Sequence, residues 1–469
     1  MTTHTPSHLA AAECATVPDQ ADQELLRLGY EPELRRTLGL GSLLVYGLLF
    51  FVPLAPVAVY GYVVNASGGV PVLVYLVAAV VMGLSALSYR EMAVRFPVAG
   101  SVYGYARLGV HPHVGFVAGW LILLDYLLMP ALLTVLAAVA LSHILSMPAA
   151  LVVVVLMAGS VALNLFGIDV TTRVGFWLLA IQLAVIACFI GFVIAGALDA
   201  QVHFTWHALA RPGMSWAAVA SAVSIAALSY LGFDAVSTLN EESTGGGTMV
   251  GRATVLLFGL LTVLFCGQLL AASIVTDATS FPPGPDTSRA FYAAVDAVAP
   301  AWFSTVFTLT NAFVAIFACL VVAHAATARL LFAMGRDGVL PAALGRTGRR
   351  GVPSLAVLVV GATSCIIAVA FASHAALMTS LVTFGALSSY VVLHGCVIYR
   401  CVVVERSRRW LTHLFVPVLG AASLVVVLSQ TQSLARNVGC AWLALGLIGY
   451  ALIGRLRRRG RDRVDLSVG

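Results

Sequence analysis

The sequence predicts an all-α, polytopic membrane protein of twelve transmembrane helices, built as two inverted repeats of five spans followed by two further spans. Its composition is 60% hydrophobic and 10% charged, with a mean hydropathy of +0.98. Soluble domains carry about 25% charged residues, so an ordinary soluble fold is excluded. Apolar runs long enough to cross a bilayer, about 20 residues each, recur along the chain. The first and sixth runs are both interrupted, and interruptions in corresponding positions of two halves indicate inverted repeats.

The expected spans follow one another with short connections. They lie at residues 39–64, 69–89, 113–144, 147–166, 174–197, 216–240, 253–275, 301–329, 354–372, 376–398, 414–430 and 438–454. This order divides the chain into an N-terminal tail at 1–38, a first repeat at 39–197, a second repeat at 216–398, two extra spans at 413–455 and a basic C-terminal tail at 456–469.

The arginines predict the orientation in the membrane. All 26 basic residues are arginine, and only Arg211, Arg289 and Arg436 lie in the connections that follow odd-numbered spans. Because basic residues concentrate in cytoplasmic loops, both termini are expected in the cytoplasm, and the protein in the inner membrane. The polar first 23 residues have no apolar core, so no cleavable signal peptide is expected. The arginine-rich run 455–463 contains no aromatic residue, which favours a topology determinant over nucleic-acid binding.

Several chemistries are not supported by the motifs. The eight cysteines form no CxxC pair and most lie in apolar runs, which favours buried apolar side chains over disulfides or a metal site. The chain has no lysine and hence no GxxxxGK phosphate loop, and it has neither HExxH nor GxSxG. We therefore expect no cofactor, no bound metal and no enzymatic activity.

An acid interrupts the sixth span. In SYLGFDAVSTLNEES, residues 229–243, Asp234 follows Gly232 and Phe233 and lies shortly after Tyr230. Ionisable groups in the membrane are costly and are retained mainly for function, and glycine suits a locally unwound helix that lines a cavity. Asp234 is thus expected to face a substrate ammonium or to bind a proton. A carboxyl that caps the broken helix and stays protonated is the alternative.

The first span carries a matching interruption. Pro53 and Pro56, beside Val52, remove backbone donors near the middle of the span. These three residues are expected to line the same site as the sixth-span break, because the two spans are five apart.

A second acid lies in the third span. Asp125 and Tyr126 occur in LLDYLLMP, near mid-depth. They are expected either to bind an amine or to bond a neighbouring helix as structural glue. Together, Asp125 and Asp234 match the two ammonium groups of a diamine.

Further polar residues are candidates for gating and coupling. Glu241 and Glu242 come two turns after Asp234, and they are either solvated charges or an internal gate with Arg90 or Arg336 as partner. Histidines in the eighth and tenth spans, His324 and His394, could titrate near neutral pH, although a lone histidine in an apolar helix is more often a packing residue.

Three stretches carry a family resemblance: residues 95–130, 229–243 and 323–341. In these the chain resembles the amino acid, polyamine and organocation transporter superfamily, and within it the bacterial putrescine importers. The resemblance implies the five-plus-five inverted-repeat fold, a central site between broken spans one and six, and proton-linked uptake. It also implies that Asp234 lines the substrate pathway and that the first span breaks near 52–56.

The chain departs from the family pattern in three places. Some proton-coupled relatives have a lysine in span five, whereas this chain offers Gln182 as the polar residue there. Gly251 stands where relatives have a proline, which predicts a more flexible loop after span six. Val52 and Ala58 are apolar where polyamine-type members have polar side chains.

The function predicted from these observations is import of putrescine or another polyamine by proton-coupled alternating access. Its expected partners are a small amine, protons and membrane lipid, without nucleic acid. An amino acid permease is the first alternative, in which backbone amides of span one hold a carboxylate. A receptor or channel that does not transport is the second.

Overall fold

The computed structural model describes residues 20–145, 147–199, 205–282, 285–348, 351–431 and 433–465. Within these ranges the chain is helical, apart from turns and an isolated bridge between Leu38 and Ser243. The first 19 residues, on which the signal-peptide expectation depends, lie outside the described part. The side chains of the C-terminal arginine run also lie outside it, although the backbone helix is described to Asp465.

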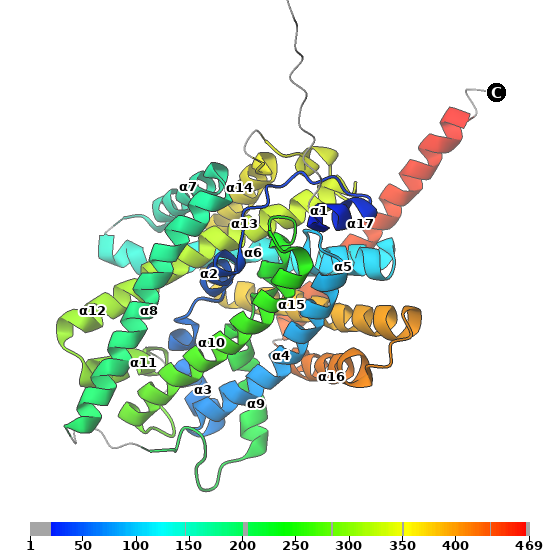
Figure 1. Cartoon of the computed structure of the whole chain (residues 1–469). Coiled ribbons are helices and arrows are strands. Elements are labelled where there is room, and N and C mark those ends of the chain that lie inside the picture. Colours follow the sequence, from blue (N-terminus) through cyan, green and yellow to red (C-terminus); the bar gives the residue numbers. More distant parts are fainter. Residues whose placement is uncertain are drawn as a thin grey trace, which may run out of the picture.

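The helices follow one another along the chain as shown in Figure 1. The first half contains α1 (Gln20–Arg27), α2 (Leu40–Phe51), α3 (Ala55–Ser67), α4 (Pro71–Arg95), α5 (Ser101–Gly109), α6 (Pro112–Leu145), α7 (Ala149–Phe166) and α8 (Ile168–Leu198). The second half contains α9 (Trp216–Ser229), η1 (Phe233–Leu239), α10 (Gly246–Thr276), α11 (Pro285–Val298), α12 (Ala301–Leu309), η2 (Thr310–Ala315), α13 (Ile316–Arg336), η3 (Ala342–Gly345), α14 (Ser354–Ala370), η4 (Ala372–His374), α15 (Ala375–Val397) and η5 (Ile398–Val404). The two extra spans are η6 (Leu411–Phe415) with α16 (Val416–Ser429), and α17 (Ser433–Asp465).

The predicted all-α membrane fold is confirmed. By length and composition, ten helices in the described residues can cross a membrane, and α2 with α3 forms an eleventh span bent by 47°. The remaining predicted span is α14, which is apolar but only 17 residues long. It is short because η4 turns the chain at once into α15.

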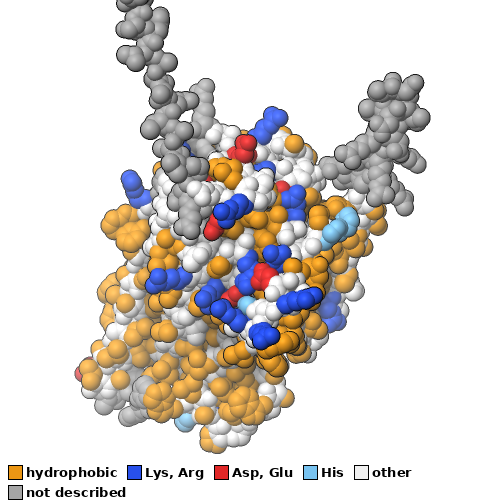
Figure 2. All heavy atoms as spheres, turned by 45° about the vertical axis from the view of Figure 1, so that its right-hand side comes forward, with side chains coloured by type: hydrophobic (Ala, Val, Ile, Leu, Met, Phe, Trp, Pro, Cys, Tyr) orange, Lys and Arg blue, Asp and Glu red, His pale blue; other side chains and the backbone are white. Residues whose placement is uncertain are grey.

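Helix α6 forms the centre of the bundle. It is one of the most buried spans and packs against α13, α15 and α5. Helices α4 and α10 pack against each other, and α1 lies at one end of the bundle (Figure 1). Figure 2 shows arginine side chains gathered toward one end of the molecule, whereas apolar side chains cover most of the remaining face. A lipid-facing surface with one charged end is what a multi-pass membrane protein requires.

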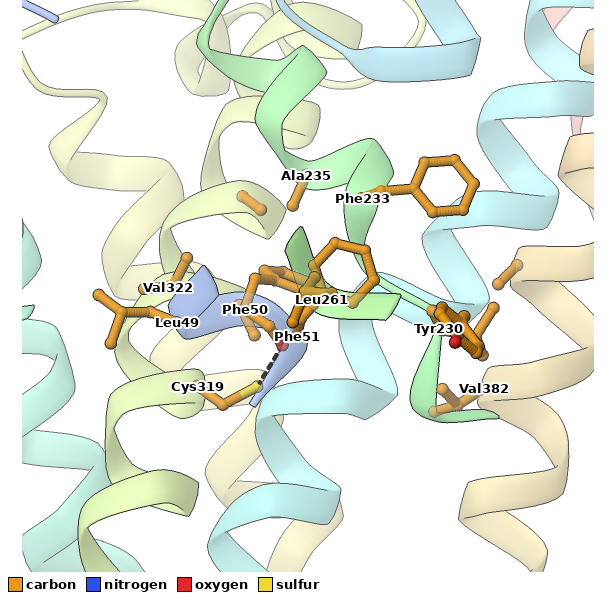
Figure 3. Packing of buried hydrophobic residues seen from close by; sticks show 14 of the residues in the cluster. Leu49, Phe50, Phe51, Tyr230, Phe233, Ala235, Leu261, Cys319, Val322 and Val382 are labelled. Carbon is orange, nitrogen blue, oxygen red and sulfur yellow. Dashed lines mark hydrogen bonds between the residues drawn. The ribbon is translucent and has the colours of Figure 1, made fainter. Parts of the chain in front are cut away.

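The first span is broken where the sequence predicts. Helix α2 ends at Phe51, Val52 has a φ of +55°, and α3 begins at Ala55. The break frees backbone carbonyls, which are costly in a membrane interior unless they find donors. The Sγ–H of Cys319 donates to the carbonyl of Phe50 at 3.1 Å (Figure 3), and Nε2 of Gln268 donates to that of Pro53 at 2.9 Å. Side chains of α13 and α10 therefore stabilise the break.

The sixth span is also broken where the sequence predicts. Helix α9 ends at Ser229, and Gly232 has a φ of +118° before the 3-10 helix η1 begins. A β-carbon on Gly232 would overlap the ring of Phe50, so the two breaks lie directly against each other. Phe51 and Phe233 stack across the same junction with ring centroids 6.2 Å apart.

Substituting Gly232 by Ala is expected to lower the free energy of unfolding by about 2 kcal/mol or more. Left-handed backbone costs a non-glycine residue about 1–3 kcal/mol, and overpacking against Phe50 adds a similar amount. Thermal unfolding of the purified protein measures this. The matched control is Gly259→Ala in α10, where a β-carbon meets open space and alanine favours the helix. Equal unfolding temperatures for the two variants would contradict the left-handed conformation at residue 232.

Candidate functional site

The carboxylate of Asp234 lies at the centre of the bundle, where η1 meets α6 and α15. Its side chain is only 1% exposed. The hydroxyl of Tyr126 donates to Oδ2 at 2.6 Å, and the hydroxyl of Tyr390 donates to Oδ1 at 2.7 Å. Hydrogen bonds to a charged acceptor are among the strongest in proteins, so the two tyrosines stabilise an anion at this point.

Asp125 is the second buried acid of the site. It is 3% exposed, and its Oδ1 is buried without a hydrogen-bond partner. Tyr126, the residue after Asp125 in α6, bonds Asp234, so the two acids lie at the same junction of η1 and α6. Neither carboxyl forms an ion pair with an arginine or histidine of the described residues, which is the arrangement expected of a cation-binding site.

Aromatic rings cluster beside Asp234. The ring of Tyr390 lies 5.4 Å from that of Tyr89 and 5.2 Å from that of Phe233, and Tyr89 lies 5.4 Å from Phe233. Aromatic faces attract cations while keeping water away. Figure 3 shows Phe50 and Phe51 at the end of α2 and Phe233 on the neighbouring segment.

The position of Tyr126 follows from a proline one turn later. Pro130 lies inside α6 and has no N–H, so the carbonyl of Tyr126 loses its helical donor. The hydroxyl of Thr327 in α13 donates to that carbonyl at 2.6 Å. Pro130 and Thr327 together hold the residue that bonds Asp234.

Replacing Thr327 by Val is expected to reduce stability and transport, because it removes the donor that positions Tyr126. The carbonyl of Tyr126 would be buried without a donor, which costs about 1–3 kcal/mol. We expect a lower unfolding temperature and reduced transport, whereas Thr327→Ser, which keeps the hydroxyl, restores both. If Thr327→Val and Thr327→Ser behaved alike, the hydroxyl would have no positioning role.

Not every residue expected at the site lies there. Tyr230 turns away from Asp234: its hydroxyl donates to the carbonyl of Tyr75 at 3.2 Å, and its ring packs on Phe258 and Phe265. The backbone break includes Val52 and Pro53, and α3 begins with Ala55 and Pro56.

The residues that sequence reasoning missed are Tyr89 and Tyr390. Both are fully buried aromatic residues with a hydroxyl group inside a span. Since a buried hydroxyl seeks a partner, Tyr390 inside the tenth apolar run was an available signal, whereas Tyr89 ends the second run beside Arg90 and gave none.

Two ion pairs form a layer between the site and the arginine-rich end, which we call the arginine–glutamate layer (Glu241, Glu242, Arg329 and Arg336). Arg336 bonds both oxygens of Glu241 at 2.7 and 2.9 Å. Arg329 bonds both oxygens of Glu242, and this pair is buried, with the arginine 7% and the glutamate 4% exposed. Of the two expected partners, Arg336 is used, whereas Arg90 is exposed. Arg329 was not anticipated.

The segment before α2 lies over this layer. The backbone N–H groups of Thr37 and Leu38 donate to the carbonyl of Glu242 at 3.1 and 3.0 Å. Nearer α1, the Tyr30 hydroxyl donates to Asp337 at 3.0 Å, and Arg107 pairs with the same carboxylate at 2.7 Å. Burial, together with the charge of Asp337, raises the pKa of Tyr30, which keeps the hydroxyl protonated as a donor.

A cavity of about 270 Å³ adjoins the layer, since Arg35, Glu242 and Arg329 are part of its lining.

Of the other coupling candidates, His324 links α13 to neighbouring helices, whereas Gln182 bonds within its own helix α8. Nδ1 of His324 lies 3.1 Å from the Ser160 hydroxyl, and Nε2 lies 2.9 Å from the Val357 carbonyl. Gln182 is buried, with Nε2 3.4 Å from the Leu178 carbonyl and Oε1 without a partner.

The other histidine candidate, His394, lies between Ser85 and Ser88, at 3.0 and 2.9 Å from their hydroxyls. No group of three or more metal-ligating side chains occurs among the residues that the structure describes.

Comparisons with known proteins agree with this architecture. The amino acid permease family model matches residues 42–450. The low-affinity putrescine importer PlaP of Escherichia coli is 30% identical, over 90% of this chain and 94% of the relative. The branched-chain amino acid permease BcaP of Bacillus subtilis is 24% identical over 91% and 94% of the two chains. A methylthioribose transporter of Bacillus subtilis is 25% identical over 84% and 88%.

Proposed function

The chain belongs to the amino acid permease family, and from that premise we propose that it imports a small amine, putrescine or a related polyamine, by alternating access. The observation that carries this proposal is the pair of buried acids, Asp125 and Asp234, neither of which pairs with a positively charged side chain of the described residues. A solute with one or two ammonium groups supplies the missing charge. An uncompensated charge in the membrane interior costs several kcal/mol, so such a site binds cations selectively.

The backbone of the first break supports an amine over an amino acid. A carboxylate in such a break is normally held by free N–H groups. Here Pro53 and Pro56 have none, and the N–H groups of Val52 and Ala55 donate to the carbonyls of Leu49 and Val52. Leu54 alone remains as a donor between residues 52 and 56. The segment is therefore poorly suited to hold a carboxylate, which would also lie near two acids.

An amino acid permease remains the second candidate, because BcaP shares the full length of the fold. In that case Asp234 would hold the amine of the substrate, and the carboxylate would find its donors outside the first break.

Closure at both ends supports alternating access. At the arginine-rich end, the arginine–glutamate layer covers the site. At the other end, Arg211 pairs with Asp277 at 2.5 Å, His207 bonds the same carboxylate at 2.9 Å, and Asn65 bonds the carbonyl of Phe281 at 3.1 Å. Opening one set of contacts at a time would expose Asp234 to one side of the membrane. The broken spans are the natural hinges for this movement, since irregular backbone absorbs changes in direction.

We propose that the arginine-rich end faces the cytoplasm of an inner membrane, as basic residues do. An ammonium then gains about 2.3 kcal/mol per charge for each 100 mV of a negative interior. A zwitterion gains nothing from the potential and needs a coupled proton. Proton coupling is part of the proposal for such substrates. Its candidates are His324, which is titratable, and Gln182, which lies where some relatives have a lysine in span five.

Uptake by purified protein in proteoliposomes tests the proposal. Labelled putrescine is offered with unlabelled diamines, monoamines or amino acids as competitors. We expect saturable uptake and counterflow, with diamines competing and leucine failing to compete. Uptake of leucine without uptake of putrescine would establish the amino acid permease instead, and absence of counterflow would favour a channel or receptor.

A further inference from the structure

We propose that the site accepts a fixed total of two positive charges, so that a diamine binds alone and a monoamine binds together with one proton on Asp125. This inference rests on the proposed function and extends it, because it makes the proton stoichiometry a property of the substrate. The two carboxyls would then form one site that always holds two positive charges, and they would differ in which of them takes up a proton.

The difference between the two carboxyls follows from their hydrogen bonds. Both oxygens of Asp234 accept a tyrosine hydroxyl, which stabilises its ionised form. Asp125 has an oxygen that is buried without any donor. When only one ammonium enters, Asp234 remains the anion that pairs with it, and Asp125 is the carboxyl that takes a proton.

No positively charged side chain of the described residues pairs with Asp125 in place of that proton. The titratable groups packed around the two acids are hydroxyls and a thiol. Tyr126 of α6 and Tyr390 of α15 bond Asp234, Tyr89 of α4 packs on Tyr390, and Cys319 of α13 bonds the carbonyl of Phe50, whose ring lies 6.4 Å from that of Tyr126. Two carboxylates that share a buried site without a cation do not both stay ionised. Positive charge must therefore come from the solute or from water.

The proton balance is independent of how many protons the empty site holds. A diamine entering with two ammonium groups displaces every proton from the two carboxyls to the solvent. A monoamine displaces all but one, which stays on Asp125. From the same empty state, diamine binding therefore releases one proton more than monoamine binding, and no other bond is made or broken.

Isothermal titration calorimetry on the purified full-length protein tests this difference. The probes are putrescine and 4-amino-1-butanol, which have the same carbon chain and differ in one ammonium group. Titrations in two buffers with different heats of ionisation give the number of protons released. We expect one more proton for putrescine, and a ratio of the two dissociation constants that changes tenfold per pH unit.

The outcomes separate the inference from the function. Equal proton numbers for two amines that both bind would overturn the inference and leave amine transport standing. Failure of both amines to bind, with binding of leucine, would overturn the proposed function itself. Asp125→Asn is expected to weaken putrescine about a hundredfold, while Asp286→Asn, an exposed acid in α11, has no effect. Unchanged putrescine affinity in Asp125→Asn would also overturn the inference.

Discussion

Replacing Asp234 by Asn is expected to reduce putrescine transport, measured as kcat/KM in proteoliposomes, by at least about a hundredfold. The carboxylate is buried and accepts hydrogen bonds from Tyr126 and Tyr390. These bonds stabilise its ionised form, which can then pair with an ammonium group of putrescine. Removing one member of a buried ion pair costs about 3–5 kcal/mol, and 1.4 kcal/mol corresponds to a factor of ten. The asparagine keeps the size of the side chain but supplies no charge.

The control for this prediction is again Asp286→Asn, which removes an exposed acid. A folding defect is recognised from the unfolding temperature and the elution profile of the variant. If folded Asp234→Asn transported putrescine with unchanged kcat/KM, the carboxylate could not be the group that holds the amine.

Breaking the pair between Arg329 and Glu242 is expected to destabilise the closed arginine-rich end. Each single variant, Arg329→Met or Glu242→Gln, leaves a buried group without its partner, at a cost of about 3–5 kcal/mol. The double variant leaves no charge behind and should regain much of that stability. A double-mutant cycle on the free energy of unfolding measures the coupling, which we expect to be about 3 kcal/mol.

The exposed pair between Arg400 and Glu405 is the matched control. Its two charged groups lie 3.1 Å apart with about a third of each side chain accessible. Such pairs contribute about 1 kcal/mol or less, because water screens them. A coupling energy for Arg329 and Glu242 as small as that of the exposed pair would show that the layer does not hold the end closed.

Much of the fold could be predicted because the membrane restricts the chain strongly. Only helices satisfy their backbone in lipid, so apolar length gives the spans. The breaks at Val52 and Gly232 were predictable because proline and glycine act on the backbone locally. The shortness of α14 was not, since it depends on the turn η4 that follows.

The partners of the site could be predicted only in part. Asp234 and Asp125 stand out as acids in apolar runs, and Tyr126 follows Asp125 directly. Tyr390 lies 156 positions from Asp234, and Arg329 lies 87 positions from Glu242. No local pattern encodes such pairings, because they depend on how α13 and α15 pack against the broken span.

The account depends on the two acids at the junction of the broken spans being the place where the amine binds. The most direct test is an experimental structure of the protein determined by electron cryo-microscopy with putrescine bound. The account predicts one ammonium about 3 Å from the carboxylate of Asp234 and the other at a similar distance from Asp125. Putrescine density elsewhere, or unbroken helix through residues 50–58 and 229–236, would contradict it.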